Sequence, residues 1–302
     1  MSSPARFVEP DGQLDVAVAQ FAAGADVEKN LHRIEELVDT ATSGSAQLVV
    51  FPEASMYAWD VPAAELAEAA VNSSTGFVDG LSSIASAAGT TLVVGMFAPV
   101  PGTAVTHPPH NRMIVVGPDG GVRAGYDKVH LFDAFSWRES QKVTPARTCP
   151  DLSELCTVEL GGFTLGLLNC YDLRFPEMAR VLVDRGADVL VVSSAWVAGP
   201  HKEMHWEALL RARAIENTCY VLGANQPPPA SAGLSMILDP MGLAAATCLG
   251  TEGVAQHRLQ QSHLRRVREA VPSLQHRRYR VTAAPPDPDP AAGPSVEHGG
   301  RR

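Results

Sequence analysis

The sequence predicts an α/β fold that forms a single domain. Apolar, strand-like runs alternate with segments of helical period from about residue 14 to residue 281, and no linker-like composition interrupts them. A chain of 302 residues could by length contain two domains. The uninterrupted alternation instead favours one large core.

The first third of the chain shows three strands with helices between them. Asp26 can cap a helix because apolar residues follow at helical spacing until Gly44 ends the pattern. Short apolar runs before and after this helix predict strands. The predicted order is a strand at 15–21, the helix, a strand at 47–51, helical stretches at 63–71 and 81–88, and a strand at 91–97.

Two hairpins are predicted in the middle of the chain. Pro118 and the glycines around it mark a turn between strands 112–116 and 121–126. The Gly161-Gly162 pair marks a second turn between strands 156–160 and 163–168. The second strand of this hairpin leads directly to Cys170.

The last third continues the alternation and then changes composition. We expect a helix at 176–185, a strand at 189–193, a helix at 201–217, a strand at 219–225, a hairpin of strands 234–238 and 243–249, and a helix at 261–270. From residue 282 onward the only large aliphatic side chain is Val296, so residues 282–302 are predicted to be a disordered Pro/Gly-rich tail. Residues 1–13 are predicted to be a flexible leader.

Composition excludes several classes of function. The formal net charge of −9 and the scarcity of basic clusters argue against nucleic acid or an anionic membrane as a partner. No apolar run approaches the ~20 residues of a membrane span. The five cysteines are odd in number and show no CxxC spacing, so neither disulfides nor a metal site is expected. We therefore expect a soluble, cytoplasmic protein without a cofactor.

Cys170 is the most informative residue of the chain. It ends a continuous apolar run that is typical of a strand buried on both faces, and Pro176 suits the first turn of a following helix. The thiol is therefore expected at a strand-to-helix turn, where a nucleophile would be accessible. A lone cysteine is more often an ordinary buried core thiol, so its assignment depends on other segments.

Two other segments resemble known catalytic motifs. Glu53 follows the apolar strand Val49-Val50-Phe51 and a proline, and Lys128 ends the alternation that precedes Val129-His130. Glu53, Lys128 and Cys170, in that order and each in its own local sequence, resemble the Glu-Lys-Cys triad of the nitrilase superfamily of carbon-nitrogen hydrolases.

The resemblance extends over residues 14–281. It is strongest for the amidase branch, which includes omega-amidase and deaminated glutathione amidase, and it also rests on Arg138-Glu139-Ser140, His205-Trp206-Glu207 and the segments 210–217 and 235–242. It implies a four-layer alpha-beta-beta-alpha sandwich, whereas the sequence pattern alone gives only a mixed α/β class. A proline-rich loop at 226–230 and a short stretch between Lys128 and Glu139 depart from the family, and both would border the substrate.

The resemblance also implies a role for each residue. Cys170 would attack the carbonyl carbon, Glu53 would take the thiol proton and pass it to the departing ammonia, and Lys128 would stabilise the negative oxygen of the intermediate. The backbone N–H of Tyr171 would be a second donor to that oxygen. Glu139 would orient Lys128, although it could instead be a surface acid of a helix.

Three further residues have two possible roles each. Arg174 could bind a substrate carboxylate through its planar fork, or it could form a structural ion pair with Asp172 or Glu177. Trp196 could form an apolar wall of the pocket or simply pack in the core. His130 suggests a Cys-His dyad, but the order of the motifs favours a supporting hydrogen-bond donor.

The sequence therefore predicts a hydrolase that cleaves a small linear amide, carrying a carboxylate, through a thioester acyl-enzyme with release of ammonia. An N-carbamoyl amino acid hydrolase or a nitrilase with the same triad is an alternative within the family. A catalytically inactive scaffold that binds a partner through the helix at 201–217 is an alternative of another class. The resemblance also implies a homodimer or a higher homo-oligomer.

Overall fold

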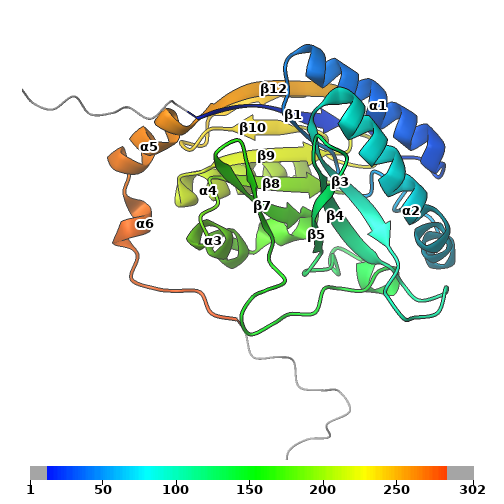
Figure 1. Ribbon diagram of the computed structural model, residues 1–302. Coiled ribbons are helices and arrows are strands. Elements are labelled where there is room, and N and C mark those ends of the chain that lie inside the picture. The colour runs from blue at the N-terminus through cyan, green and yellow to red at the C-terminus, as the bar shows by residue number, and fades with distance from the viewer. Residues whose placement is uncertain (1–11, 284–302) are drawn as a thin grey trace, which may run out of the picture.

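The computed structural model describes residues 12–283, and it contains two six-stranded sheets that pack face to face between outer helices (Figure 1). The four-layer alpha-beta-beta-alpha sandwich implied by the resemblance is confirmed. The predicted leader and tail lie almost entirely outside the described residues, so the domain limits stay a prediction. Within residues 12–283, no helix has both the length and the apolar character needed to cross a bilayer.

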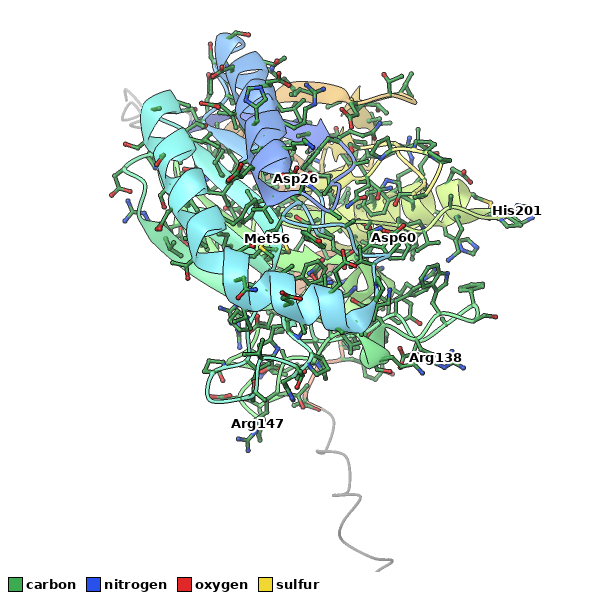
Figure 2. The ribbon with its side chains drawn as sticks, turned by 90° about the vertical axis from the view of Figure 1, so that its right-hand side faces the viewer. Asp26, Met56, Asp60, Arg138, Arg147 and His201 are labelled. Carbon is green, nitrogen blue, oxygen red and sulfur yellow. The ribbon has the colours of Figure 1, made fainter. Side chains whose placement is uncertain are left out.

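The first sheet has the strand order β12-β1-β2-β3-β4-β5. Helices α1 (Val27–Ser43) and α2 (Ala63–Ala88) lie side by side across its outer face (Figures 1 and 2). Its strands are β1 (Gln13–Gln20), β2 (Leu48–Val50), β3 (Thr91–Ala98), β4 (His110–Val116), β5 (Val122–Asp127) and β12 (Gly253–Gln260).

The second sheet has the order β11-β10-β9-β8-β7-β6 and is covered by α3 (Pro176–Asp184) and α4 (Lys202–Asn217). Its strands are β6 (Thr157–Leu160), β7 (Phe163–Asn169), β8 (Val189–Ser194), β9 (Tyr220–Asn225), β10 (Met236–Leu238) and β11 (Ala244–Thr247). The remaining helices are the short 3-10 helices η1 (Glu139–Gln141) and η2 (Cys170–Arg174), and α5 (Gln261–Ala270) and α6 (Ser273–His276).

The two sheets share one pattern of strand pairing. From β12 to β5, and again from β6 to β11, the successive pairs are antiparallel, parallel, parallel, antiparallel and antiparallel. As a result β2, β3 and β5 run in one direction, and so do β7, β8 and β9. Their carboxyl ends gather at common edges, where α/β folds usually place their ligands.

Alternating side chains of the first sheet build two separate cores. Val16 and Val18 of β1 pack toward the second sheet, while Ala17 and Ala19 pack toward the outer helices. This period of two is what a strand covered on both faces requires. It explains why residues 16–19 of β1 are all apolar in the sequence.

One prediction about an individual element is wrong, and one strand was missed. The stretches 63–71 and 81–88 belong to one continuous helix, α2, because buried residues such as Ser74 and Phe77 keep the helical period through the intervening Ser, Thr and Gly residues. Gly80 allows α2 to pack closely against α1, since a Cβ at this position would lie 2.7 Å from the Leu31 side chain of α1. Strand β12 was not predicted, because only Ala255 and Leu259 of its eight residues are buried.

Candidate active site

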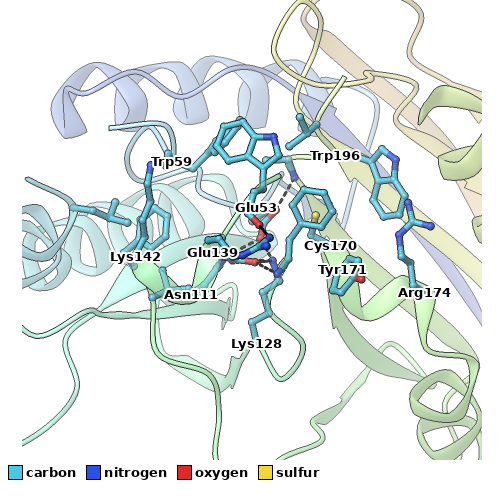
Figure 3. Close-up of a pocket in the computed structure, with 18 of the residues that line it drawn as sticks. Glu53, Trp59, Asn111, Lys128, Glu139, Lys142, Cys170, Tyr171, Arg174 and Trp196 are labelled. Carbon is cyan, nitrogen blue, oxygen red and sulfur yellow. Dashed lines mark hydrogen bonds and ion pairs between the residues drawn. The ribbon is translucent and has the colours of Figure 1, made fainter. Parts of the chain in front are cut away.

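A cavity opens beside the loops that follow the strands of both sheets, and it is lined by all seven side chains that the sequence singled out (Figure 3). These are Glu53, Lys128, Glu139, Cys170, Tyr171, Arg174 and Trp196. The lining also includes Trp59, Asn111, Phe132, Lys142 and Lys202, which the sequence did not indicate.

Strand direction explains why the three central residues meet. Glu53 follows β2, Lys128 follows β5, and Cys170 follows β7, so each lies just beyond a carboxyl end. Gly95 of the neighbouring strand β3 makes room for the first of them. A Cβ at this position would lie 2.6 Å from the Glu53 Cα and 2.7 Å from the carbonyl oxygen of Pro52.

Lys128 lies between two carboxylates. Its Nζ donates to Glu53 Oε1 at 2.7 Å and to both Glu139 oxygens at 2.9 Å. Only 2% of Lys128 and 5% of Glu53 is exposed, so this ionic network is shielded from water. The expected proximity of Glu139 to Lys128 is confirmed, and the alternative of a free surface acid is excluded by these bonds.

Asn111 joins the network and was missed by the sequence. Its Nδ2 donates to Glu53 Oε1 at 2.7 Å and to Glu139 Oε1 at 3.1 Å, while its Oδ1 accepts from Asn169, the residue before the thiol. It lies near the start of β4, which is antiparallel to β3 and β5 and therefore begins where they end. In the sequence, the only signal for a role of Asn111 was its polar side chain at the start of an apolar strand.

Residues that follow strands of the second sheet bind the other carboxylate oxygen and the backbone carbonyl of Glu53. Its Oε2 accepts from the backbone N–H of Ala195 at 2.8 Å, and its backbone carbonyl accepts from Gln226 Nε2 at 2.9 Å. Both partners follow strands of the second sheet, β8 and β9. The carboxylate is therefore held at the junction of the two sheets, in the cavity that Cys170 also lines.

Burial and charge together set the pKa values of the central groups. Burial raises the pKa of the Glu53 carboxyl, but the Lys128 ammonium outweighs it, and the pKa lies below its ordinary value. Burial lowers the pKa of Lys128, yet Glu139 and Glu53 hold it well above the usual range. Burial, reinforced by the charge of Glu53, raises the pKa of the Cys170 thiol. At neutral pH the resting site therefore holds a neutral thiol beside ionised groups.

Cys170 has a backbone conformation that few non-glycine residues adopt. Its φ is +48°, in the left-handed region, where residues at functional sites are over-represented. Asp172, two positions later, holds this turn in place. Its Oδ2 accepts from Tyr126 Oη at 2.6 Å and from the Asn169 N–H at 3.1 Å, and its Oδ1 accepts from the backbone N–H of His130 at 3.0 Å.

The same contacts assign His130 a supporting position. Its Nδ1 lies 2.9 Å from Asp172 Oδ1, and its ring stacks on Phe175 with centroids 3.6 Å apart. Asp172 thereby ties the loop after Lys128 to the turn that carries Cys170. A Cys-His dyad is not formed.

Arg174 has no acidic partner. Among residues 12–283 no ion pair joins it to Asp172 or Glu177, and its buried Nε and Nη2 atoms have no hydrogen-bond partner. Its guanidinium instead lies over the rings of Trp196 and Tyr171, with centroid distances of 4.7 and 5.9 Å. The structural ion pair considered from the sequence is therefore absent, and Trp196 forms a wall of the cavity.

The opposite side of the cavity has a different character. Trp59 packs against Trp137 with centroids 4.9 Å apart, and Lys142 Nζ donates to the backbone carbonyls of Trp59 and Val61. Figure 3 shows Trp59 and Lys142 on the far side of the central residues from Trp196 and Arg174. In the part of the chain that is described, no cluster of three His, Cys, Asp or Glu residues could hold a metal ion.

Comparison with known proteins identifies the family. The carbon-nitrogen hydrolase family model matches residues 15–269, which is most of the chain. This chain belongs to the carbon-nitrogen hydrolases of the nitrilase superfamily. Such a family, with relatives named as amidases and hydrolases, makes the protein an amide-cleaving enzyme.

Similar proteins support the same family assignment for this carbon-nitrogen hydrolase. It is 34% identical to the deaminated glutathione amidase of Escherichia coli O157:H7, over 90% of this chain and 98% of that protein. A hydrolase of Mycobacterium tuberculosis is 38% identical over 75% of this chain and 82% of its own length. Among solved structures, a nitrilase superfamily member from Saccharomyces cerevisiae superposes with a TM-score of 0.76 at 26% identity, covering 89% of this chain and 97% of that one.

Proposed function

We propose that this enzyme is a cysteine-dependent amidase that hydrolyses a small linear amide carrying a carboxylate, through a thioester on Cys170. The observation that carries the proposal is the buried arrangement of Glu53, Lys128 and Cys170 in one cavity, with Lys128 bonded to Glu53 at 2.7 Å. Each residue supplies one requirement of acyl transfer: a nucleophile, a base and a fixed cation.

In the first half-reaction the Cys170 sulfur bonds to the amide carbon as its proton moves to Glu53. The carbonyl oxygen becomes negative and accepts from Lys128 Nζ and from the backbone N–H of Tyr171, which lies in the first turn of η2, where N–H groups have no intrahelical acceptor. The C–N bond then breaks, the proton on Glu53 passes to the nitrogen, and ammonia leaves. A thioester remains on Cys170.

In the second half-reaction water attacks the thioester carbon and gives its proton to Glu53. The oxygen again becomes negative and is stabilised by the same donors. The C–S bond breaks, the sulfur recovers the proton from Glu53, and the carboxylic acid product departs. Glu139 keeps Lys128 aimed at the cavity in both steps, since it accepts from the ammonium at 2.9 Å.

The pKa directions indicate how the thiol is activated. The raised pKa of Cys170 and the lowered pKa of Glu53 disfavour a resting thiolate. Proton transfer must therefore accompany attack on the substrate carbon, as the new C–S bond removes electron density from sulfur. Only a bound carbonyl makes the transfer favourable, which keeps the free thiol weakly reactive.

Relatives favour the same proposal. The amidase from Nesterenkonia sp. AN1 superposes with a TM-score of 0.75 at 25% identity, over 90% of this chain and 97% of that one, in a complex with acrylamide. In a variant of that amidase, acrylamide undergoes Michael addition at the active site cysteine. These likenesses support Cys170 as the nucleophile here and an amide as its substrate.

A product analysis separates amide hydrolysis from the related reactions. The enzyme is offered linear ω-amide acids, N-carbamoyl amino acids and nitriles, and both ammonia and carbon dioxide are measured. We expect ammonia without carbon dioxide, from amides only. Carbon dioxide from carbamoyl substrates would assign a carbamoylase instead, and acid formed from a nitrile would assign a nitrilase.

Replacing the nucleophile tests the mechanism. Cys170→Ala should abolish ammonia release while the protein stays folded, because a small thiol contributes little packing. Residual activity within about tenfold of wild type would contradict the assignment, since loss of a true nucleophile costs far more. A homodimer or higher homo-oligomer, which the resemblance implies, and a cytoplasmic location, which the composition predicts, both stay predictions.

A further inference from the structure

The cavity is basic although the chain is acidic. Five basic and two acidic side chains line it, whereas the formal net charge of the chain is −9. Charged groups gathered in a cleft raise the local concentration of ligands of opposite sign. The cavity therefore favours a negatively charged substrate, and the question is which of the five cations binds it.

Three of the five cations are excluded by their surroundings. Lys128 is bonded to two carboxylates, and Lys142 donates to the backbone carbonyls of Trp59 and Val61. Arg138 is exposed and donates to the Trp137 carbonyl at the outer edge, where Figure 2 labels it. Only two cations of the cavity remain.

Lys202 is one of these two, and its position is unusual. It is the first residue of α4 and only 6% exposed, yet among residues 12–283 its ammonium has no carboxylate partner. Nζ instead lies 4.0 and 4.8 Å from the ring centroids of Phe135 and Phe132. A buried cation without an anion is costly, so burial and the charge of Arg174 both lower the pKa of Lys202.

Arg174 is the other, and one tryptophan links it to Lys202. The Arg174 guanidinium lies 4.7 Å from the Trp196 ring centroid, and the indole N–H of Trp196 donates to the Lys202 carbonyl at 3.0 Å. Trp196 therefore contacts the Arg174 guanidinium and the Lys202 backbone, and the two cations are near enough for the charge of Arg174 to lower the pKa of Lys202. Their mutual repulsion is relieved when an anion binds at this place.

We propose that Arg174 and Lys202 together form one carboxylate subsite, and that Lys202 determines the preference of the enzyme for acidic amides over neutral ones. The unpartnered Nε and Nη2 atoms of Arg174 form the edge of the guanidinium that binds a carboxylate through two parallel hydrogen bonds. The Lys202 ammonium supplies a third donor to the same group. This inference rests on the proposed amidase function and deepens it.

Lys202 could instead act only by holding the loop that carries Phe132 and Phe135. In that role it would affect every substrate alike, because Phe132 lines the cavity that every substrate enters. The acid-to-ester ratio separates the two roles, because loss of the charge weakens only the acid whereas loss of the loop contact weakens both substrates. Lys202→Arg is the conservative control, since a guanidinium keeps both the charge and the attraction to aromatic faces. Lys202→Met removes both and leaves a side chain of similar length.

The kinetic test compares a matched pair of substrates, glutaramate and its neutral methyl ester. In Lys202→Met, the kcat/KM ratio of acid to ester should fall roughly tenfold or more, because a hydrogen bond to a charged group contributes about 1.5–3 kcal/mol. Arg174→Lys should lower the same ratio, and Lys202→Arg should retain most of it. Equal losses for both substrates in Lys202→Met would overturn the subsite.

A matched control corrects for net charge. Lys29 lies on α1, its side chain is 84% exposed, and it pairs only with Asp26 outside the cavity. Lys29→Met removes the same charge from the same residue type, and it should leave the acid-to-ester ratio at the wild-type value. A fall in this control as large as that of Lys202→Met would attribute the effect to overall charge and would overturn the proposal.

Binding separates failure of the subsite from failure of the amidase function. Calorimetry with glutarate needs no turnover, and its Kd should weaken roughly tenfold or more in Lys202→Met. If wild type hydrolyses neither substrate but this change in Kd is found, the amidase proposal fails and the subsite stands. If the amide is hydrolysed but glutarate binds both proteins equally, the subsite alone is refuted.

Discussion

Two buried lysines line the same cavity, and the groups beside their ammonium ions are of opposite kinds. Lys128 is 2% exposed and donates to two carboxylates, which hold its pKa well above the usual range. Lys202 is 6% exposed, its ammonium lies over two aromatic rings and has no carboxylate partner among residues 12–283, and its pKa is lowered. Both side chains have little exposed surface, and their sites differ in whether carboxylates compensate the charge.

The difference separates two tasks. A compensated charge is fixed before the substrate arrives, which suits a group that must stabilise a charge formed during the reaction. An uncompensated charge gains a partner only when a ligand brings one, which suits recognition of that ligand. Lys128 has the first environment, and Lys202 and Arg174 have the second.

Lys128→Met should produce the largest effect. It removes the fixed donor to the developing negative oxygen and leaves the buried Glu53 and the partly buried Glu139 without their cation. Turnover should fall by roughly 10³-fold or more, and the free energy of unfolding should fall by about 3–5 kcal/mol. Steady-state ammonia assays and urea unfolding measure the two losses. A variant that keeps wild-type stability would contradict the compensated network.

The pH dependence follows from the same network. The pKa of Glu53 is lowered from 4.5, so its ionised form and the stability that the ion pair contributes persist above 4.5 and are lost as pH falls through the folded value. The pKa of Lys128 is raised above 10.5, so its charge is lost only beyond that value. We expect kcat/KM for the neutral amide, whose binding does not depend on the charge of Lys202, to be flat from about pH 5 to about pH 9, the range between these limits. A tenfold rise per unit toward 9.0, the ordinary pKa of a thiol, would indicate a free thiolate as the attacking species.

Tyr126→Phe tests a third buried charge, that of Asp172. The phenol donates to this carboxylate at 2.6 Å, and its removal should cost about 1.5–3 kcal/mol of stability. Because Asp172 holds the turn of Cys170, kcat should fall for acidic and neutral amides by the same factor. Thermal unfolding and the matched substrate pair measure both. A change in the acid-to-ester ratio would show that the turn also shapes the carboxylate subsite.

Lys202→Met should change stability least. The variant loses the contacts of the ammonium with two aromatic rings, and it also loses a buried charge that had no anion. These effects oppose each other, so the free energy of unfolding should change by less than about 1 kcal/mol in the absence of ligand. Urea unfolding beside Lys128→Met gives a direct comparison. A loss as large as that of Lys128→Met would remove the distinction between the two lysines.

The sequence was sufficient for the residues that carry their own local signal. Glu53, Lys128 and Cys170 each follow a predicted strand within a distinctive motif, and the structure brings all three to one cavity. The helix period and the turn residues likewise predicted most elements. Such signals are local, so a single sequence contains them.

The sequence was insufficient where the environment of a residue comes from distant segments. Asn111 contacts Glu53, Glu139 and Asn169 only because β4 begins where β3 and β5 end. The ammonium of Lys202 lies beside the rings of Phe132 and Phe135, which come some 70 positions earlier in the chain, so its own local sequence could not indicate this environment. Strand β12 was missed for a related reason, since it is defined by pairing with β1 at the other end of the domain.

The most direct test of the account is the mass of the acyl group trapped on the enzyme. Wild type is mixed with equal amounts of glutaramate and its methyl ester, quenched in acid within the first turnover, and digested for mass spectrometry. We expect the peptide containing Cys170 to gain the acyl group of glutaramate, which is the amide minus ammonia, in excess over that of the ester. An adduct on another residue, or an excess of the neutral acyl group on Cys170, would contradict it.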